Sequence, residues 1–165
     1  MSALLTGAAL LAAALGGTAL WLRGRYVAVT IDGRSMLPTH RPGERLLVRR
    51  TTARAVRTGQ VVVLGGFGGP RPAGRRSLAT SAPDEGPTWI IKRVAAVPGD
   101  PVPRATVPAL AGAPGDQVPP GHLVLLGDNP PYSRDSRQAG YFTADRLLGV
   151  VVRRMEEARP AGNPG

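Results

Sequence analysis

The run TWIIKRVAAV, residues 88–97, is rich in apolar and β-branched side chains and predicts a β-strand. Successive side chains of a strand point to opposite faces, so Ile90, Lys92 and Val94 share one face. Lys92 is the only lysine among the 21 basic residues of the chain. The strand therefore places a single ionisable amine on an otherwise apolar face.

An amine in such a place can act as a base. Arginine stays protonated in proteins, whereas burial lowers the pKa of a lysine and lets it lose its proton. A surface lysine without a chemical role is the alternative that the strand alone leaves open.

The rest of the chain predicts a small all-β domain over residues 25–155, with no convincing helical periodicity. Each further strand is short, apolar and bounded by Gly or Pro. They are expected at Tyr26–Ile31, Glu44–Arg49, Gln60–Leu64, His122–Leu126 and Arg146–Val152. Two Pro/Gly-rich segments, 65–87 and 98–121, are expected to be flexible loops, the second with a short hairpin, and residues 156–165 a disordered tail.

Composition excludes several kinds of site. The chain has no cysteine, which excludes disulfides, thiolate metal sites and a cysteine nucleophile. Its two histidines, His40 and His122, are too few for a histidine metal cluster, and both are expected to be incidental. These exclusions favour a protein that needs neither a metal nor another cofactor.

The N-terminal segment predicts a membrane anchor over residues 1–24. Residues 3–22 carry no charge, and a helix of this length spans the hydrocarbon core of about 30 Å. Trp21, followed by Arg23 and Arg25, is typical of the end of such a span. A cleavable signal peptide is the alternative, but no charged region precedes the apolar run.

The formal net charge of +10 favours an anionic partner, but the arginines are scattered and no nucleic-acid-binding pattern is present. The expected partner surface is a lipid bilayer. Positive charge follows the anchor rather than preceding it, which by the positive-inside rule would place the domain in the cytoplasm.

A second chemical motif is the loop Gly33-Arg-Ser-Met-Leu-Pro-Thr39, directly after the first predicted strand. Ser35 is well placed for a nucleophile, but a serine hydroxyl needs a neighbouring base to take its proton. With no suitable histidine, Lys92 is the candidate, since Ser-Lys pairs are a known solution. A turn serine without function is the alternative. The polar run from Gly127 to Arg137, after the strand at 122–126, offers further side chains to such a site.

These three segments together resemble type I signal peptidases, membrane serine proteases with a Ser/Lys dyad, and in size the small actinobacterial members. Residues 35–39 (SMLPT) resemble the nucleophile box of that family, Lys92-Arg-Val followed by Pro98-Gly-Asp resembles its lysine box, and Gly127-Asp-Asn with residues 133–137 resembles its last box. The order, the spacing and the anchor also agree, over most of residues 25–152. Each box alone is a weak signal, whereas three in order are specific.

The resemblance implies a signal-peptidase-like β-domain tethered to one transmembrane helix, and a role for each matching residue. Ser35 would attack the scissile carbonyl and Lys92 would act as general base. Ser133 matches the residue that orients the lysine, and Asp135 with Arg137 matches the pair that shapes the site. Further supporting residues are Asp128 and Met36, the latter expected to contact lipid or substrate.

The resemblance also implies the setting of the enzyme. Its substrates would be signal-peptide-bearing precursors cut after small residues, in an Ala-X-Ala pattern. The protein would be a single-pass cell-membrane monomer with its catalytic domain outside the cytoplasm.

The chain departs from the family at two positions. Gly33 stands where some members carry a Ser or Thr that donates to the oxyanion hole, and Gln60 stands where an Asp is usual. Three alternatives remain. One is a dedicated maturation protease for a single precursor, possible also on the cytoplasmic side, and another is a self-cleaving repressor, which the N-terminal apolar segment disfavours. The third is an inactive membrane-tethered binding module, against which the intact Ser35, Lys92, Asp135 and Arg137 argue.

Overall fold

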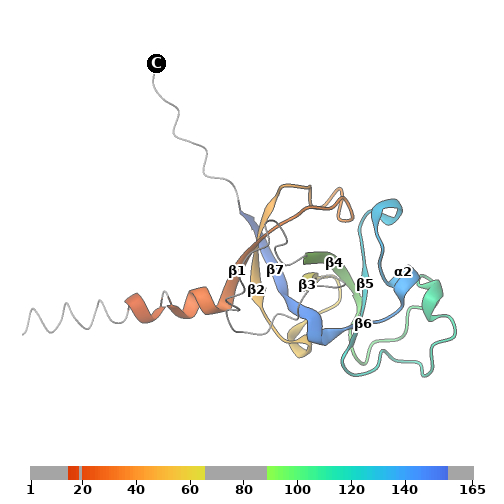
Figure 1. Ribbon diagram of the computed structural model, residues 1–165. Helices are drawn as coiled ribbons and strands as arrows, with labels where there is room; N and C mark the ends of the chain where they lie inside the picture. Colours follow the sequence, from red (N-terminus) through yellow and green to blue (C-terminus); the bar gives the residue numbers. More distant parts are fainter. Residues whose placement is uncertain (1–14, 19, 66–88, 156–165) are drawn as a thin grey trace, which may run out of the picture.

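The computed structural model describes residues 15–18, 20–65 and 89–155. These residues form a curled, wholly antiparallel seven-stranded sheet in the order β1-β2-β7-β3-β4-β5-β6 (Figure 1). The strands are β1 (Tyr26–Thr30), β2 (Arg45–Arg50), β3 (Val61–Gly65), β4 (Trp89–Ala96), β5 (His122–Leu126), β6 (Phe142–Thr143) and β7 (Leu147–Met155). The predicted β class is thus confirmed.

The six predicted strands all exist, with ends shifted by at most three residues. The sequence did not predict the short strand β6 or the single-turn helix α2 (Ser136–Ala139), nor four short 3-10 helices at Ala53–Ala55, Pro108–Leu110, Pro130–Tyr132 and Ala144–Arg146. The segment expected to be a loop at 65–87 and the tail at 156–165 lie, apart from Gly65, outside the described residues.

The sheet curls because β-bulges interrupt the pairing of its long strands. The pairing of β2 with β7 shifts register between Leu47 and Val48, and β3 with β7 shifts between Val63 and Leu64. Such bulges increase the local twist of a strand pair. In β7, Gly149 allows close approach: a Cβ there would lie 2.1 Å from the carbonyl oxygen of Arg49. In Figure 1, β1 lies at one side of the domain, whereas β5 and β6 lie at the other.

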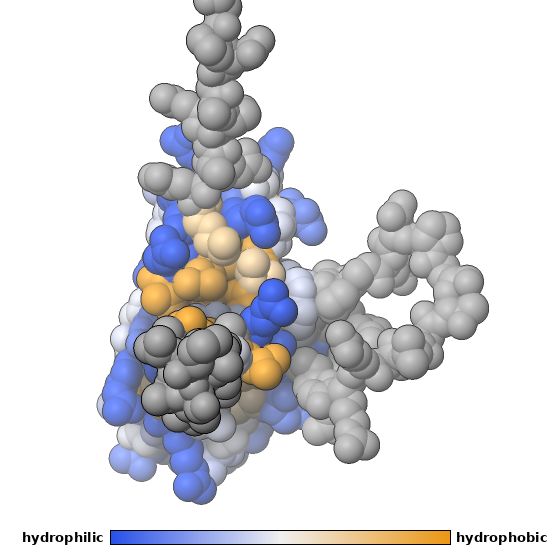
Figure 2. Space-filling view, turned by 90° about the vertical axis from the view of Figure 1, so that its left-hand side faces the viewer, coloured by the Kyte–Doolittle hydropathy of each residue, from blue (hydrophilic) through white to orange (hydrophobic). Residues whose placement is uncertain are grey.

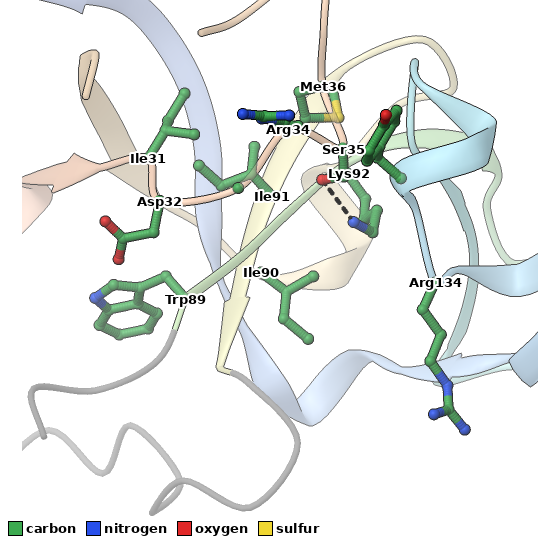
Figure 3. Close-up of a pocket in the computed structure, with 12 residues that line it drawn as sticks. Ile31, Asp32, Arg34, Ser35, Met36, Trp89, Ile90, Ile91, Lys92 and Arg134 are labelled. Atoms are coloured by element: carbon green, nitrogen blue, oxygen red, sulfur yellow. Dashed lines mark hydrogen bonds between the residues drawn. The ribbon is translucent and has the colours of Figure 1, made fainter. Parts of the chain in front are cut away.

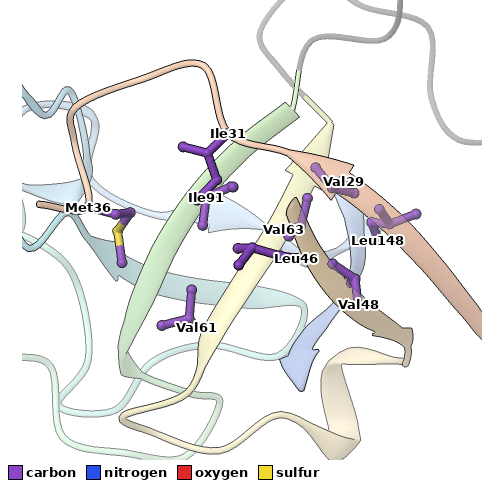
Figure 4. Close-up of a cluster of buried hydrophobic side chains, with 9 residues drawn as sticks. All are labelled: Val29, Ile31, Met36, Leu46, Val48, Val61, Val63, Ile91 and Leu148. Atoms are coloured by element: carbon purple, nitrogen blue, oxygen red, sulfur yellow. The ribbon is translucent and has the colours of Figure 1, made fainter. Parts of the chain in front are cut away.

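Alternating side chains of the central strands fill two apolar clusters. Val63 and Ile91 belong to the cluster that includes Met36 (Figure 4), whereas Val62 and Val94 belong to the other. Lys92 lies opposite Val62 in the β3–β4 register and so on the face of the second cluster. The predicted placement of Lys92 and Val94 on one face is in agreement with this register.

The segment at 98–121 is a packed lobe, so the expectation of a flexible loop was wrong. Val102, Val107, Leu110 and Val118 are buried there against β4 and β5. The expected hairpin is reduced to one bridge between Pro101 and Gln117. Apolar residues spaced between the prolines supply a small core of their own, which the Pro/Gly content concealed.

Residues 15–18 and 20–25 are helical and lead directly into β1. Apolar side chains gather on the face of the domain from which this helix departs, with hydrophilic side chains around them (Figure 2). Leu20 and Trp21 are largely exposed, and the Arg25 guanidinium lies 5.1 Å from the Trp21 ring centroid. Within the described residues no helix is both long and apolar enough to span a membrane, and most of the predicted anchor lies outside them.

Candidate active site

Ser35 and Lys92, which lie 57 positions apart in the sequence, meet in the structure. The Lys92 Nζ donates a hydrogen bond of 2.9 Å to the Ser35 Oγ (Figure 3). Ser35 comes from the turn that follows β1, and Lys92 from the middle of β4. The two predicted residues therefore lie in direct contact.

Lys92 is buried, with 4% of its surface exposed. Burial lowers the pKa of its amine below the ordinary value, because the charged form loses water. Asp135 opposes this through its negative charge, and Arg137 adds to it through its positive charge. The amine is thus moved toward the neutral form that a general base requires.

The Ser35 turn is held from the loop after β5. The backbone N–H of Asn129 donates to the Ser35 carbonyl at 2.9 Å, and the Asn129 side-chain amide donates to the Arg34 carbonyl at 3.0 Å. Gly127 allows this approach, since a Cβ there would lie 2.7 Å from the Ser35 carbonyl oxygen and 2.1 Å from the Ser133 Oγ. Two loops are thereby locked together around the serine.

Asp128 ties the serine turn to the lysine strand. Its carboxylate accepts two hydrogen bonds from Arg93, at 2.8 and 2.6 Å, and one from the Thr39 hydroxyl at 2.5 Å. Burial alone would raise the pKa of Asp128, but the bonds from Arg93 and Thr39 outweigh it and the pKa is lowered. Because Arg93 is next to Lys92 and Thr39 ends the turn, this ion pair fixes the spacing of the two segments.

Asp135 is the second carboxylate of the site and is fully buried. It accepts hydrogen bonds from the Gly127 N–H, the Ser133 hydroxyl and three N–H groups of Arg137, at 2.6 to 3.0 Å. Burial would raise its pKa, but the bonds from Arg137, Gly127 and Ser133 prevail and hold the pKa at about 2. Asp135 also caps α2, where the Gln138 side chain accepts from the Asp135 N–H.

Two predicted residues occupy places that differ from expectation. The Ser133 hydroxyl donates to Asp135 at 2.6 Å, and within the described residues no hydrogen bond joins it to Lys92. Met36 is 1% exposed and packs in the core, so it is not available to lipid, but it also lines the pocket, and its expected contact with substrate stays a prediction. Its side chain is apolar and the turn directs it inward, which the sequence did not reveal.

The dyad opens into a pocket of about 290 Å³. Its walls come from the turn after β1, the first half of β4, and the loop that holds Tyr132 and Arg134. Within the described residues, Trp89 to Lys92 pair with β3 alone, since the pairing with β5 begins at Arg93. One backbone edge of this half-strand therefore faces the pocket without a strand partner.

The site also contains residues to which sequence reasoning assigned no role. Thr39 and Asn129 connect the loops, and Gln138 completes the cap of α2. The pair Asp135 and Gln138 has the spacing of a capping box, a signal that the sequence does carry. The roles of Thr39 and Asn129 depend instead on tertiary contacts.

Neither histidine contacts Ser35 or Lys92 in the described structure. The His40 Nδ1 lies 3.5 Å from Glu44, and the His122 ring packs against Tyr141. No group of three or more His, Cys, Asp or Glu side chains capable of holding a metal ion occurs among residues 15–18, 20–65 and 89–155.

Comparison with known proteins places the chain in a family. A search of curated proteins finds no match to the chain. The family "Signal peptidase, peptidase S26" matches residues 3–109 and 104–155, which together cover nearly the whole sequence. The chain belongs to this signal peptidase family.

Proposed function

We propose that the protein is a membrane-anchored serine endopeptidase that cleaves signal or leader peptides after small residues by a Ser/Lys dyad. Family membership supports a peptidase of the signal peptidase type. The observation that carries the finer proposal is the 2.9 Å contact between the Ser35 hydroxyl and a buried lysine amine.

In the proposed mechanism a neutral Lys92 accepts the Ser35 proton as the Oγ attacks the scissile carbonyl. The tetrahedral intermediate collapses, the peptide C–N bond breaks, and Lys92 gives its proton to the leaving amine. Lys92 then takes a proton from the water that attacks the acyl-enzyme, the ester bond to the Ser35 Oγ breaks, and Lys92 returns the proton to that oxygen, which restores the neutral amine. Every step uses the same amine, so its pKa must lie close to the working pH.

The edge of β4 that has no strand partner among the described residues suggests a binding mode for the substrate. An extended peptide can add to an exposed strand edge through main-chain hydrogen bonds, which require no particular side chain. The stretch from Trp89 to Lys92 leads to the dyad, so a peptide bound along it would deliver its backbone carbonyl to Ser35. The preference for small residues rests on the family resemblance.

The oxyanion hole includes the backbone N–H of Ser35 in this proposal. Gly33 contributes no side chain, and the space beside it is open: a Cβ there would have the Ser35 nitrogen as its nearest neighbour, at 4.0 Å. The hole thus lacks a side-chain donor from this position.

The membrane setting belongs to the same proposal. The uncharged run at residues 3–22 would form a single-pass anchor, with the catalytic domain outside the cytoplasm and the substrates being precursors that carry signal peptides. The exposed Leu20 and Trp21 beside the first strand, and the apolar face around the helix, support a domain held close to the bilayer.

The test is cleavage of an Ala-X-Ala signal-peptide substrate by the full-length protein in detergent, comparing wild type with Lys92→Arg. The variant keeps the charge but cannot deprotonate, so we expect a loss of at least about 10³-fold in kcat. Arg153→Lys, on the exposed end of β7, is the matched control and should cleave like wild type. Equal cleavage by Lys92→Arg and wild type would show that Lys92 is not the base.

A further inference from the structure

The described part of the chain contains seven acidic residues, and six of them have partners. Those six are Glu44, Asp100, Asp116, Asp128, Asp135 and Asp145. Asp32 is the exception: it is exposed and makes no hydrogen bond or ion pair with any residue that the structure describes. In a chain of net charge +10, a carboxylate that pairs with no cation of the described residues is informative.

Asp32 lines the pocket that contains the dyad. In Figure 3 its carboxylate and the Trp89 ring lie at one end of the pocket, and Ser35 with Lys92 lies toward the other. A carboxylate beside an aromatic ring suits a Lys or Arg side chain, since the carboxylate pairs with the charge and the ring face attracts it as well. Trp89 is half-buried and packed against the core, so its ring is held in place.

The distance from the dyad follows from the strand. Trp89 lies three positions before Lys92 on the edge that is free of β5. A bound extended peptide advances about 3.3 Å per residue, so this end of the pocket lies about 10 Å from the dyad. A long basic side chain adds several ångströms of reach, which places its residue about three to five positions from the scissile bond.

We propose that Asp32, with Trp89, is a specificity site that selects substrates carrying a basic residue about three to five positions from the scissile bond. This inference rests on the proposed endopeptidase function and adds a charge requirement to it. Two exposed arginines line the same pocket. Arg134 comes from the loop after β5, and the Arg34 guanidinium lies 6.0 Å from the Tyr132 ring centroid. The preference for a basic side chain is therefore confined to the end of the pocket at Asp32.

The experiment uses the full-length protein in nonionic detergent and a panel of Ala-X-Ala peptides. A single Lys or Glu is placed at each position about three to five residues to either side of the scissile bond. We expect one position at which Lys exceeds Glu by about fivefold to tenfold in kcat/KM, and by less at high salt. Asp32→Asn should abolish the Lys preference, and Asp32→Lys should reverse it toward Glu.

Asp116→Asn is the matched control, because its carboxylate is 98% exposed on the lobe and outside the pocket, and it should leave the Lys-to-Glu ratio unchanged. Binding of labelled peptides to Ser35→Ala, measured by fluorescence anisotropy with and without Asp32→Lys, tests the same ratio without catalysis. Equal treatment of Lys and Glu at every position overturns the specificity site while leaving the peptidase intact. Binding with the expected charge ratio but no cleavage by the wild type overturns the peptidase and retains the site.

Discussion

Two ionisable side chains are buried within one site. The surroundings of one favour its neutral form, and the surroundings of the other favour its charged form. Lys92 is 4% exposed, and the one side-chain hydrogen bond of its amine in the described structure is to Ser35. Asp135 is fully buried and accepts five hydrogen bonds. Desolvation prevails at the lysine and moves it toward its neutral form, whereas hydrogen bonding prevails at the aspartate and keeps it charged.

The difference distinguishes the proposed catalytic side chain, Lys92, from a structural one, Asp135. A base needs a charge that is easily lost, so it must have few partners. A carboxylate that organises a loop needs a charge that persists, so each of its oxygens must be satisfied. The dyad should therefore tolerate substitution without unfolding, and the Asp135 cluster should not.

Ser35→Ala is the substitution for which we expect the largest effect on activity. Removing the nucleophile should lower kcat by at least about 10⁴-fold, because no other group can form the acyl-enzyme. The free energy of unfolding should change by less than about 1 kcal/mol, since one half-buried hydroxyl is lost. Peptide cleavage and urea unfolding, measured on the same preparation, check both halves. Retained cleavage would mean that another residue is the nucleophile.

Asp135→Asn should have the opposite effect, because it should mainly lower the free energy of unfolding. The amide cannot accept the full set of bonds from Gly127, Ser133 and Arg137, and Arg137 loses its buried counter-ion. Breaking a buried pair on one side costs about 3 to 5 kcal/mol of stability. Urea unfolding at neutral pH is the measurement, with the exposed Asp116→Asn as its control. A loss equal to that of the control would remove Asp135 from its structural role.

The lowered pKa of the same carboxylate predicts that the protein loses folding stability in acid. The pKa of Asp135 is about 2 in the folded protein, below the unfolded value of about 3.9. Its contribution is therefore complete above about pH 4 and is lost as the pH falls through about 2. Asp135→Asn should show a smaller loss of stability than wild type across this window in urea unfolding, and parallel curves would contradict the assignment.

The lysine half of the comparison predicts the pH dependence of cleavage. Only neutral Lys92 can accept the serine proton, so kcat should rise with pH, by about tenfold per unit below the pKa of the amine, and level off above it. Because burial lowers that pKa, the midpoint should lie below the ordinary lysine value of 10.5. A rate that stays constant down to about pH 5 would show that an amine is not the base.

Sequence reasoning succeeded where one local rule governs the residue. Apolar alternation and Gly/Pro boundaries identified every long strand, and the exceptional lysine identified the base candidate. The lobe at 98–121 was missed, since its buried Val107 and Val118 are too widely spaced for a periodic signal. The partner of the Ser133 hydroxyl depends on where the loop after β5 folds back, which no local pattern encodes.

Gly33 gives the smallest expected effect and the only gain. The site has room for a side chain at this position, and the nearest atom to an added Cβ is the Ser35 nitrogen, at 4.0 Å, which is the proposed oxyanion donor. A hydroxyl from Gly33→Ser would therefore lie on the same side as that N–H and could donate to the oxyanion.

A fully organised oxyanion donor contributes up to about 10²–10³-fold to kcat. An added donor on an exposed turn should raise kcat by up to about tenfold, with KM little changed. Gly33→Ala is the matched control, because it carries the Cβ without the hydroxyl and should not raise kcat. Equal rates for the Ser and Ala variants would show that the oxyanion lies elsewhere.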